Sequence, residues 1–342
     1  MLSPVVQDAI KDIQPLLDAA VAAAVDRRWR ALRCPAGALG RFQELVTHYQ
    51  IIQNSPEGIL RRKALFVFCA DHGITEEKAG PLTRDTSAAL ASDFLRGDAP
   101  GSVLCRHYGI ELSAIDAGLH GPVVPGALPH RVMDGAFNFT RAAAMSPDQT
   151  NAALETGMAL AADAAQRFDV AGIAFVGAGA AVSAAAVFAA LMGRDPADTT
   201  LRSAGLADAI HAAQLSVIRA GLARRNQSFV SPFGVLAGVG GPDIAMAAGF
   251  LLGAALQRLP VIIDCFTGAA AALVARGFCA DSLDAAIFAH DSGDPAHRNL
   301  FAALDVVPQV NLGLGAAPGC GAAVVVNMLD AGIRLFNEVG EE

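Results

Sequence analysis

Five apolar stretches of this chain each end beside polar or small residues whose side chains or backbone could take part in chemistry. These residues are Asp71, His72, Asp116, Gly177, Asp264 and His290. Carboxylate and imidazole groups accept and donate protons, and glycine turns let a backbone approach a phosphate. The sequence therefore predicts proton transfer and anion binding, provided that the fold brings these stretch ends together.

The stretches have the pattern of buried parallel strands. Each is a short, nearly continuous apolar run bounded by turn residues: 65–70, 110–115, 170–176, 260–263 and 285–289. Such runs are typical of strands that helices cover on both faces. Helical patterns alternate with them, so we expect a doubly wound α/β fold with a mainly parallel sheet. In such folds ligands bind beyond the carboxyl ends of the strands.

The first sixty residues have helical patterns and no strand. Residues 3–32 suit one or two amphipathic helices, and residues 41–53 suit another. We predict that residues 1–60 form a helical N-terminal lobe, which the last helix (321–338) joins and which is a candidate dimer contact. Residues 61–342 then form the α/β domain.

The composition argues against several functional classes. The chain has 342 residues, of which 53% are hydrophobic and 17% charged, and its net charge is −8 without a basic tract. It can bury a large core, and no nucleic-acid partner is expected. The uncharged stretch 170–193 is long enough to cross a bilayer, but glycines interrupt it, so no membrane partner is expected.

The same sequence favours a reducing cytoplasm. The N-terminus lacks the basic and apolar regions of a signal peptide. The six cysteines have no zinc-site spacing and no C-x-x-C pair. We therefore predict a cytoplasmic protein with free thiols and no bound metal.

Three glycine-rich loops could hold a phosphate. They are residues 177–179, 238–241 and 313–321, each followed by a helical pattern. A helix N-terminus supplies free N–H groups to an anion. None of the loops has the Gly-Lys-Ser/Thr of a P-loop, and the dinucleotide fingerprint is poorly matched. Each loop by itself also fits a simple packing turn.

Several segments follow one another in an order that matches one enzyme family. They are residues 35–41, 70–74, 94–97, 116–118, 138–139, 144–146, 239–245, 264–266 and 290–297. Together they resemble nicotinate-nucleotide:5,6-dimethylbenzimidazole phosphoribosyltransferase, a family of the cobamide lower-ligand pathway. The resemblance implies transfer of ribose 5-phosphate from nicotinate mononucleotide to an aromatic base, forming α-ribazole phosphate. It also implies a homodimer and no organic cofactor.

The chain departs from this family where the family carries its chemistry. The glutamate that serves as general base falls on Pro318, a second glutamate near the acceptor falls on Ala178, and the phosphate-side lysine falls on Gln214. Residues 75–80, where the family contacts the acceptor, are shortened and altered. Proline cannot accept a proton and glutamine carries no charge, so this chain needs another base and another phosphate contact.

The residues at the stretch ends and in the glycine loops are the candidates for these roles. Asp264 and Asp71 are the candidate catalytic groups. The candidate substrate-binding residues are His72, Gly177, Gly179, Ser183, Gln214, Gly240, Gly241, Asp243, His290, Ser292, Asp294, Gly315, Gly319 and Gly321. Asp243 also fits a charge at a helix N-terminus and Asp264 a turn former, so structural roles stay open.

Two functional hypotheses follow from the sequence. The first is an enzyme of this family that transfers phosphoribose to a benzimidazole-like or other aromatic acceptor, such as a phenol or small azole. The alternative is a catalytically inactive paralogue that binds a nucleotide or azole as a sensor or partner subunit, because both glutamates and the lysine are replaced together. A dehydrogenase would rest on the glycine loops alone.

Overall fold

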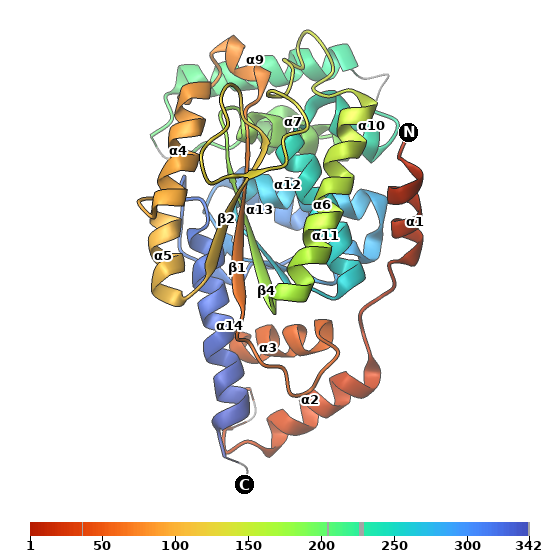
Figure 1. Ribbon diagram of the computed structural model, residues 1–342, viewed down its shortest axis with the longest axis vertical. Coiled ribbons are helices and arrows are strands. Elements are labelled where there is room, and N and C mark those ends of the chain that lie inside the picture. The colour runs from red at the N-terminus through yellow and green to blue at the C-terminus, as the bar shows by residue number, and fades with distance from the viewer. Residues whose placement is uncertain (36, 204, 226–228, 341–342) are drawn as a thin grey trace.

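A parallel six-stranded sheet forms the centre of the molecule (Figure 1), in the order β3-β2-β1-β4-β5-β6. The strands are β1 (Lys63–Ala70), β2 (Glu111–Gly118), β3 (Leu128–Pro129), β4 (Val170–Val176), β5 (Val261–Ile263) and β6 (Ala286–Phe288). Beside it, β7 (His290–Asp291) pairs with β8 (Val310–Asn311). This is a computed structural model, and it describes residues 1–35, 37–203, 205–225 and 229–340. The predicted α/β class with a parallel sheet is confirmed.

Helices cover both faces of this sheet. They are α1 (Pro4–Asp12), α2 (Ala19–Ala31), α3 (Arg41–Ile52), α4 (Arg84–Arg96), α5 (Pro100–Tyr108), α6 (Pro147–Arg167), α7 (Ala180–Met192), α8 (Pro196–Thr199), α9 (Asp208–Arg225), α10 (Pro232–Val239), α11 (Pro242–Gln257), α12 (Cys265–Phe278), α13 (Pro295–Leu304) and α14 (Cys320–Glu338). A 3₁₀ helix (Gly73–Glu77) follows β1.

The two faces of the sheet bury alternate side chains of each strand. In β1, Phe66 and Phe68 belong to one core, and Leu65 and Val67 belong to the other. Phe250 of α11 packs on Phe66 with ring centroids 5.3 Å apart. Because both faces are apolar, the polar residues of the strands gather at their ends.

The N-terminal helices pack in two places. Val6 of α1 lies in the core that α6 and α11 share. By contrast, α2 and α3 pack beside the C-terminal part of α14, below the sheet in Figure 1. There the Trp29 and Phe336 ring centroids are 4.7 Å apart, and Trp29 Nε1 donates to Thr47 Oγ1 at 3.0 Å. We call α2, α3 and the end of α14 the helical lobe.

Most local predictions agree with the structure, and one is wrong. The predicted start of α6 has Ser146 as N-cap and a complete capping box. The uncharged stretch 170–193 is divided into β4 and α7, and no helix in the described ranges meets the length and hydropathy needed to cross a membrane. The glycine-rich loop predicted at 238–241 begins later than expected, because residues 238 and 239 belong to the last turn of α10, which Ser231 caps and whose apolar residues are buried.

Candidate active site at the carboxyl edge of the sheet

The carboxyl ends of four neighbouring strands bring the predicted polar residues together. Asp71 and His72 follow β1, Gly177 follows β4, Asp264 follows β5, and His290 lies two residues after β6. Since β4 lies between β1 and β5, and strands are ~4.8 Å apart, the β1 and β5 ends are about 10 Å apart. The site is therefore two buried groups on either side of the Gly177 turn.

The first group is an ion pair between His72 and Asp243. His72 Nε2 lies 3.1 Å from Asp243 Oδ1 and 3.2 Å from Oδ2, and both side chains are buried. Burial lowers the pKa of His72, but the Asp243 carboxylate, with smaller contributions from Asp71 and the Gly240 backbone, more than offsets this, so the pKa is raised from its ordinary value. A Cβ at Gly241 would lie 2.2 Å from His72 Cε1, so glycine at 241 leaves the room that the imidazole occupies.

This pair makes the stability of the protein depend on pH. The pKa of His72 is raised in the folded protein. The stabilisation that charged His72 gives the fold is therefore fully present below the pKa of the unfolded state, and it is lost as pH rises through the pKa of the folded state. We expect Asp243→Asn to lower the free energy of unfolding, by about 3–5 kcal/mol at acid pH. This loss in the free energy of unfolding should be smaller at about pH 8.5 than at about pH 5.5, as measured by denaturant titration at the two pH values. An equal deficit at both pH values would contradict this.

Both carboxylate oxygens of Asp71 accept a hydrogen bond from the protein. Its Oδ1 accepts from Ser87 Oγ at 2.6 Å, and its Oδ2 accepts from the His120 backbone N–H at 2.9 Å. Burial raises the pKa of Asp71, and these hydrogen bonds oppose the increase. Ser87 Oγ in turn accepts the Ala178 N–H at 2.8 Å. Asp71 therefore ties β1 to α4 and the Gly177 turn, and its candidacy as a catalytic group remains a prediction.

The second group is built around Asp264, the N-cap residue of α12. Its Oδ2 accepts the Gly319 N–H at 2.6 Å, and its Oδ1 lies 3.0 Å from His290 Nδ1. The last two atoms are close enough for an ion pair but lack a well-aligned hydrogen bond. Burial lowers the pKa of His290 and Asp264 raises it, with a net increase. A Cβ at Gly321 would lie 2.3 Å from both unaligned atoms.

The Gly177 turn separates the two groups. A Cβ at Gly177 would lie 1.8 Å from the Ala70 carbonyl oxygen, so only glycine lets the ends of β4 and β1 approach this closely. Gly179 has φ +86° and is the N-cap of α7. Gly319 has φ +80° and is the N-cap of α14. These glycines meet the positive-φ or close-approach requirement that the loop pattern predicted.

Three helices direct uncapped N-termini at this edge. The N-cap positions of α7, α12 and α14 make no side-chain hydrogen bond to their helices. Uncapped N–H groups and the helix dipole together favour an anion. Gly241 leaves the start of α11 in the same condition. The edge therefore offers backbone donors to a phosphate without a cationic side chain.

Buried polar atoms without a hydrogen-bond partner also concentrate at this edge. Among the described side chains, five of the eight such atoms lie here: His72 Nδ1, Ser183 Oγ, Asp264 Oδ1, His290 Nδ1 and His297 Nε2. Two of them, Asp264 Oδ1 and His290 Nδ1, face each other at 3.0 Å without a well-aligned hydrogen bond. An unsatisfied buried polar atom costs about 1–3 kcal/mol, so such atoms mark positions where a ligand or water completes the structure. Ser183, on α7, is a predicted site residue of this kind.

The remaining predicted residues lie at or beyond the margin of these two groups. Asp294 caps α13, with Oδ1 accepting from Ala296 N at 2.9 Å and Oδ2 from Arg202 N at 2.6 Å. Ser292 Oγ lies 3.0 Å from His297 Nδ1. Gln214 is nearly buried on α9, and Gly315 lies on an exposed loop. Gly240 ends α10, where a Cβ would lie 2.5 Å from the Leu236 carbonyl oxygen.

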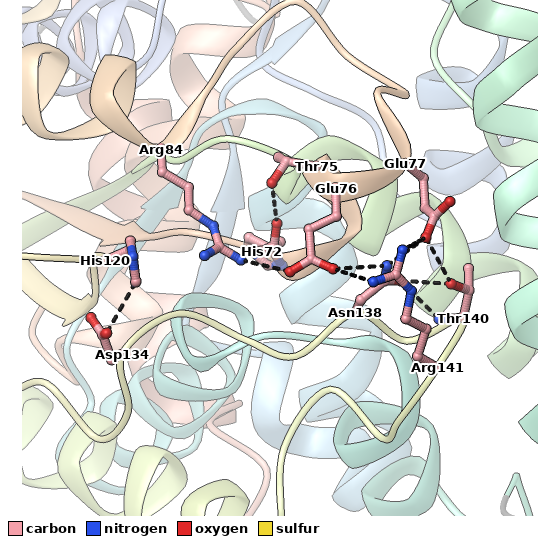
Figure 2. Close-up of polar contacts among 10 residues, drawn as sticks. All are labelled: His72, Thr75, Glu76, Glu77, Arg84, His120, Asp134, Asn138, Thr140 and Arg141. Carbon is pink, nitrogen blue, oxygen red and sulfur yellow. Dashed lines mark hydrogen bonds and ion pairs between the residues drawn. The ribbon is translucent and has the colours of Figure 1, made fainter.

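A layer of charged side chains beside His72 was not predicted (Figure 2). Figure 2 shows Glu76 between Arg84 and Arg141, with ion-pair distances of 3.3 Å and 3.0 Å. Glu77 accepts from Asn138 Nδ2 at 2.7 Å and from Arg141 at 2.8 Å. The Asn138 hydrogen bond and Arg141 lower the pKa of Glu77. The altered segment 75–80 carries the two acidic residues of this layer.

Fold and site together define an α/β protein with a candidate anion-binding site at the carboxyl edge of a parallel sheet. Residues 14–342 match the family model described as Phosphoribosyltransferase. The chain belongs to this phosphoribosyltransferase family.

The relatives share nearly the whole length of the chain. The nicotinate-nucleotide–dimethylbenzimidazole phosphoribosyltransferases of Geobacter metallireducens and Cupriavidus taiwanensis are 32% and 35% identical to it. These matches cover 97% and 96% of this chain, and 95% of each relative. The crystal structure of CobT from Thermus thermophilus superposes with a TM-score of 0.87 at 29% identity, covering 93% of this chain and 96% of that one.

Proposed function

We propose that this protein transfers the 5-phosphoribosyl group of nicotinate mononucleotide to a nitrogen of a benzimidazole-like acceptor. The products are nicotinate and an α-ribazole phosphate, the activated lower ligand of a cobamide. The observation that carries the proposal is the concentration of buried polar atoms without a well-aligned hydrogen bond at the edge where three uncapped helices begin. Near-complete coverage of the named relatives supports this substrate class.

The chain's own residues divide the task between backbone and side chains. The N-termini of α7, α12 and α14 hold the phosphate, because Gln214 at the family's lysine position has no charge. The nicotinate ring is a cationic pyridinium while it is bonded to the ribose, so it leaves readily once the ribose is positioned. The remaining requirement is a group that takes the acceptor's proton. Asp264 is the proposed catalytic group, and Asp71 contributes by fixing the Gly177 turn.

The test is acceptor-dependent release of nicotinate. Purified protein is incubated with nicotinate mononucleotide and a panel of benzimidazoles, purines and phenols, and nicotinate is followed by chromatography. We expect release with at least one benzimidazole and none without acceptor. Asp264→Asn should slow release, whereas Asp330→Asn should not, because Asp330 pairs with Lys63 at the opposite end of the sheet. If the folded protein releases no nicotinate with any acceptor of the panel, the proposal is refuted.

We further propose that the protein is a cytoplasmic homodimer in which residues 1–60 contribute to the contact, through α2 and α3 of the helical lobe. Leu17 and Ile59 of this segment are exposed large apolar side chains, which suits a protein contact. Sedimentation analysis should give twice the mass of one chain. The inactive binding paralogue has no support in the comparisons, in which the relatives named above are called transferases.

A further inference from the structure

The hydrogen bond of His290 to Leu314 fixes which ring nitrogen is basic. His290 Nε2 lies 3.2 Å from the Leu314 carbonyl oxygen. A carbonyl oxygen only accepts, so in the neutral ring the proton must be on Nε2. The lone pair of Nδ1 then faces Asp264 Oδ1 across 3.0 Å. Nδ1 of His290 and Oδ1 of Asp264 are then both hydrogen-bond acceptors, and one proton added between them would form a hydrogen bond.

The position of this site coincides with the family's missing base. Asp264 Oδ2 holds the N–H of Gly319, the residue directly after Pro318. Gly321, three residues after Pro318, is the residue whose Cα lies against both unaligned atoms. The segment above the pair, 311–316, is mostly exposed. The pair itself is buried, so the proton of an acceptor that lies against this loop must reach it through a water molecule or a small movement of the loop.

We propose that the Asp264–His290 pair receives the proton of the acceptor base, in place of the glutamate that the family carries at position 318. This inference rests on the proposed function. The acceptor's nitrogen lone pair forms the new bond to C1′ of the ribose. The C1′–N bond of nicotinate mononucleotide breaks, and its electron pair neutralises the pyridinium of nicotinate. The N–H proton of the acceptor moves to His290 Nδ1 and later to solvent, so no further reactant is required.

The other ionisable groups around the pair do not compete for this proton. Burial lowers the pKa of His297 to about 3, so its ring stays neutral. Burial raises the pKa of the Cys265 thiol to about 12 and also raises that of Cys320. Asp291 is held by Arg298, 2.7 Å away, which lowers the pKa of Asp291 below its ordinary value although burial raises it.

The test compares His290→Gln with the native protein. The glutamine amide reaches the position of Nε2 and keeps a donor for Leu314, but it has no basic nitrogen. We expect a loss of about 10²–10⁴-fold in kcat. The acid limb of the pH–rate profile, which in the native protein reflects protonation of His290 as pH falls, should disappear. The defect should also shrink with nitro-substituted benzimidazoles, whose more acidic N–H needs less help from a base.

Asp264→Asn is the second variant, because it keeps an oxygen for Gly319 while its amide blocks the Nδ1 lone pair. It should show the same three effects. His48→Gln is the matched control, because His48 lies on α3 outside the site and its Nε2 also lies against a backbone carbonyl, that of Asp284, at 2.9 Å; it should keep the native acid limb and acceptor dependence. Thermal unfolding checks that both pair variants are folded. If folded pair variants keep the native acid limb and the native acceptor dependence, the inference fails while the transferase function stands. If the native protein releases no nicotinate, the proposed function itself fails.

Discussion

Replacing Pro318 by glutamate is expected to raise the rate of nicotinate release with 5,6-dimethylbenzimidazole. The new carboxylate would stand directly before Gly319, whose N–H Asp264 holds. A positioned general base contributes ~10²–10⁴-fold, and we expect the lower end, about 10²-fold, because in the proposed mechanism the Asp264–His290 pair already takes the proton. The gain should be largest in the His290→Gln background, where the pair has lost its basic ring nitrogen. Steady-state release of nicotinate measures it.

Pro318→Gln is the matched control, because it removes the same proline without adding a base. Equal rates for the glutamate and glutamine variants would show that a carboxylate at position 318 does not limit the reaction. Ala178, the second position where the family has a glutamate, behaves differently. It is fully buried and its N–H is bonded to Ser87. A charged side chain there would be buried without a partner, so adding Ala178→Glu should destabilise the protein rather than accelerate it.

Gly249→Ala is expected to cause a large loss of stability. Helices α6 and α11 approach so closely that a Cβ at Gly249 would lie 2.0 Å from the Leu154 carbonyl oxygen. A Cβ at Gly157, on the facing helix, would likewise lie 1.9 Å from the Met246 carbonyl oxygen. The obstructing atoms are backbone atoms of a second helix, so the helices must separate. Overpacking costs about 1–3 kcal/mol or more, and it exceeds the ~1 kcal/mol that alanine gains over glycine within a helix.

Denaturant titration measures this effect as a fall in the free energy of unfolding. Gly80→Ala is the control, because a Cβ at Gly80 meets no atom within 4 Å. An unchanged midpoint for Gly249→Ala would mean that the two helices can move apart without loss. The double variant Gly157→Ala/Gly249→Ala should cost less than the sum of the single variants, since one displacement relieves both contacts.

The sequence predicted the positions of the strand ends well, because burial on both faces leaves a simple signal. Continuous apolar runs such as 170–176 identified the central strands, and parallel topology then placed Asp71, Asp264 and His290 at one edge. The start of α6 was equally clear, since Ser146, Pro147 and Gln149 make a local capping pattern. These features depend on residues that are close in sequence.

The contacts that define the site could not be read in this way. Asp264 and Gly319 are 55 residues apart in the chain, and their hydrogen bond depends on how α14 packs. Ser87, which links Asp71 to Ala178, is one small polar residue on a helix whose sequence gives no sign of it. The charged layer around Glu76 is formed by exposed side chains of three separate segments, with no period to reveal it.

Helix α14 separates the helical lobe from the candidate site, which matters for the design of an assay. Its first turn touches the Asp264–His290 pair, and its last turns pack in the helical lobe against Trp29. With 19 residues at ~1.5 Å per residue it spans about 28 Å. A surface linker or fluorescent label attached to the lobe would therefore be several ligand lengths away from the site. Immobilised by that end, the protein would present the carboxyl edge of its sheet to the solution.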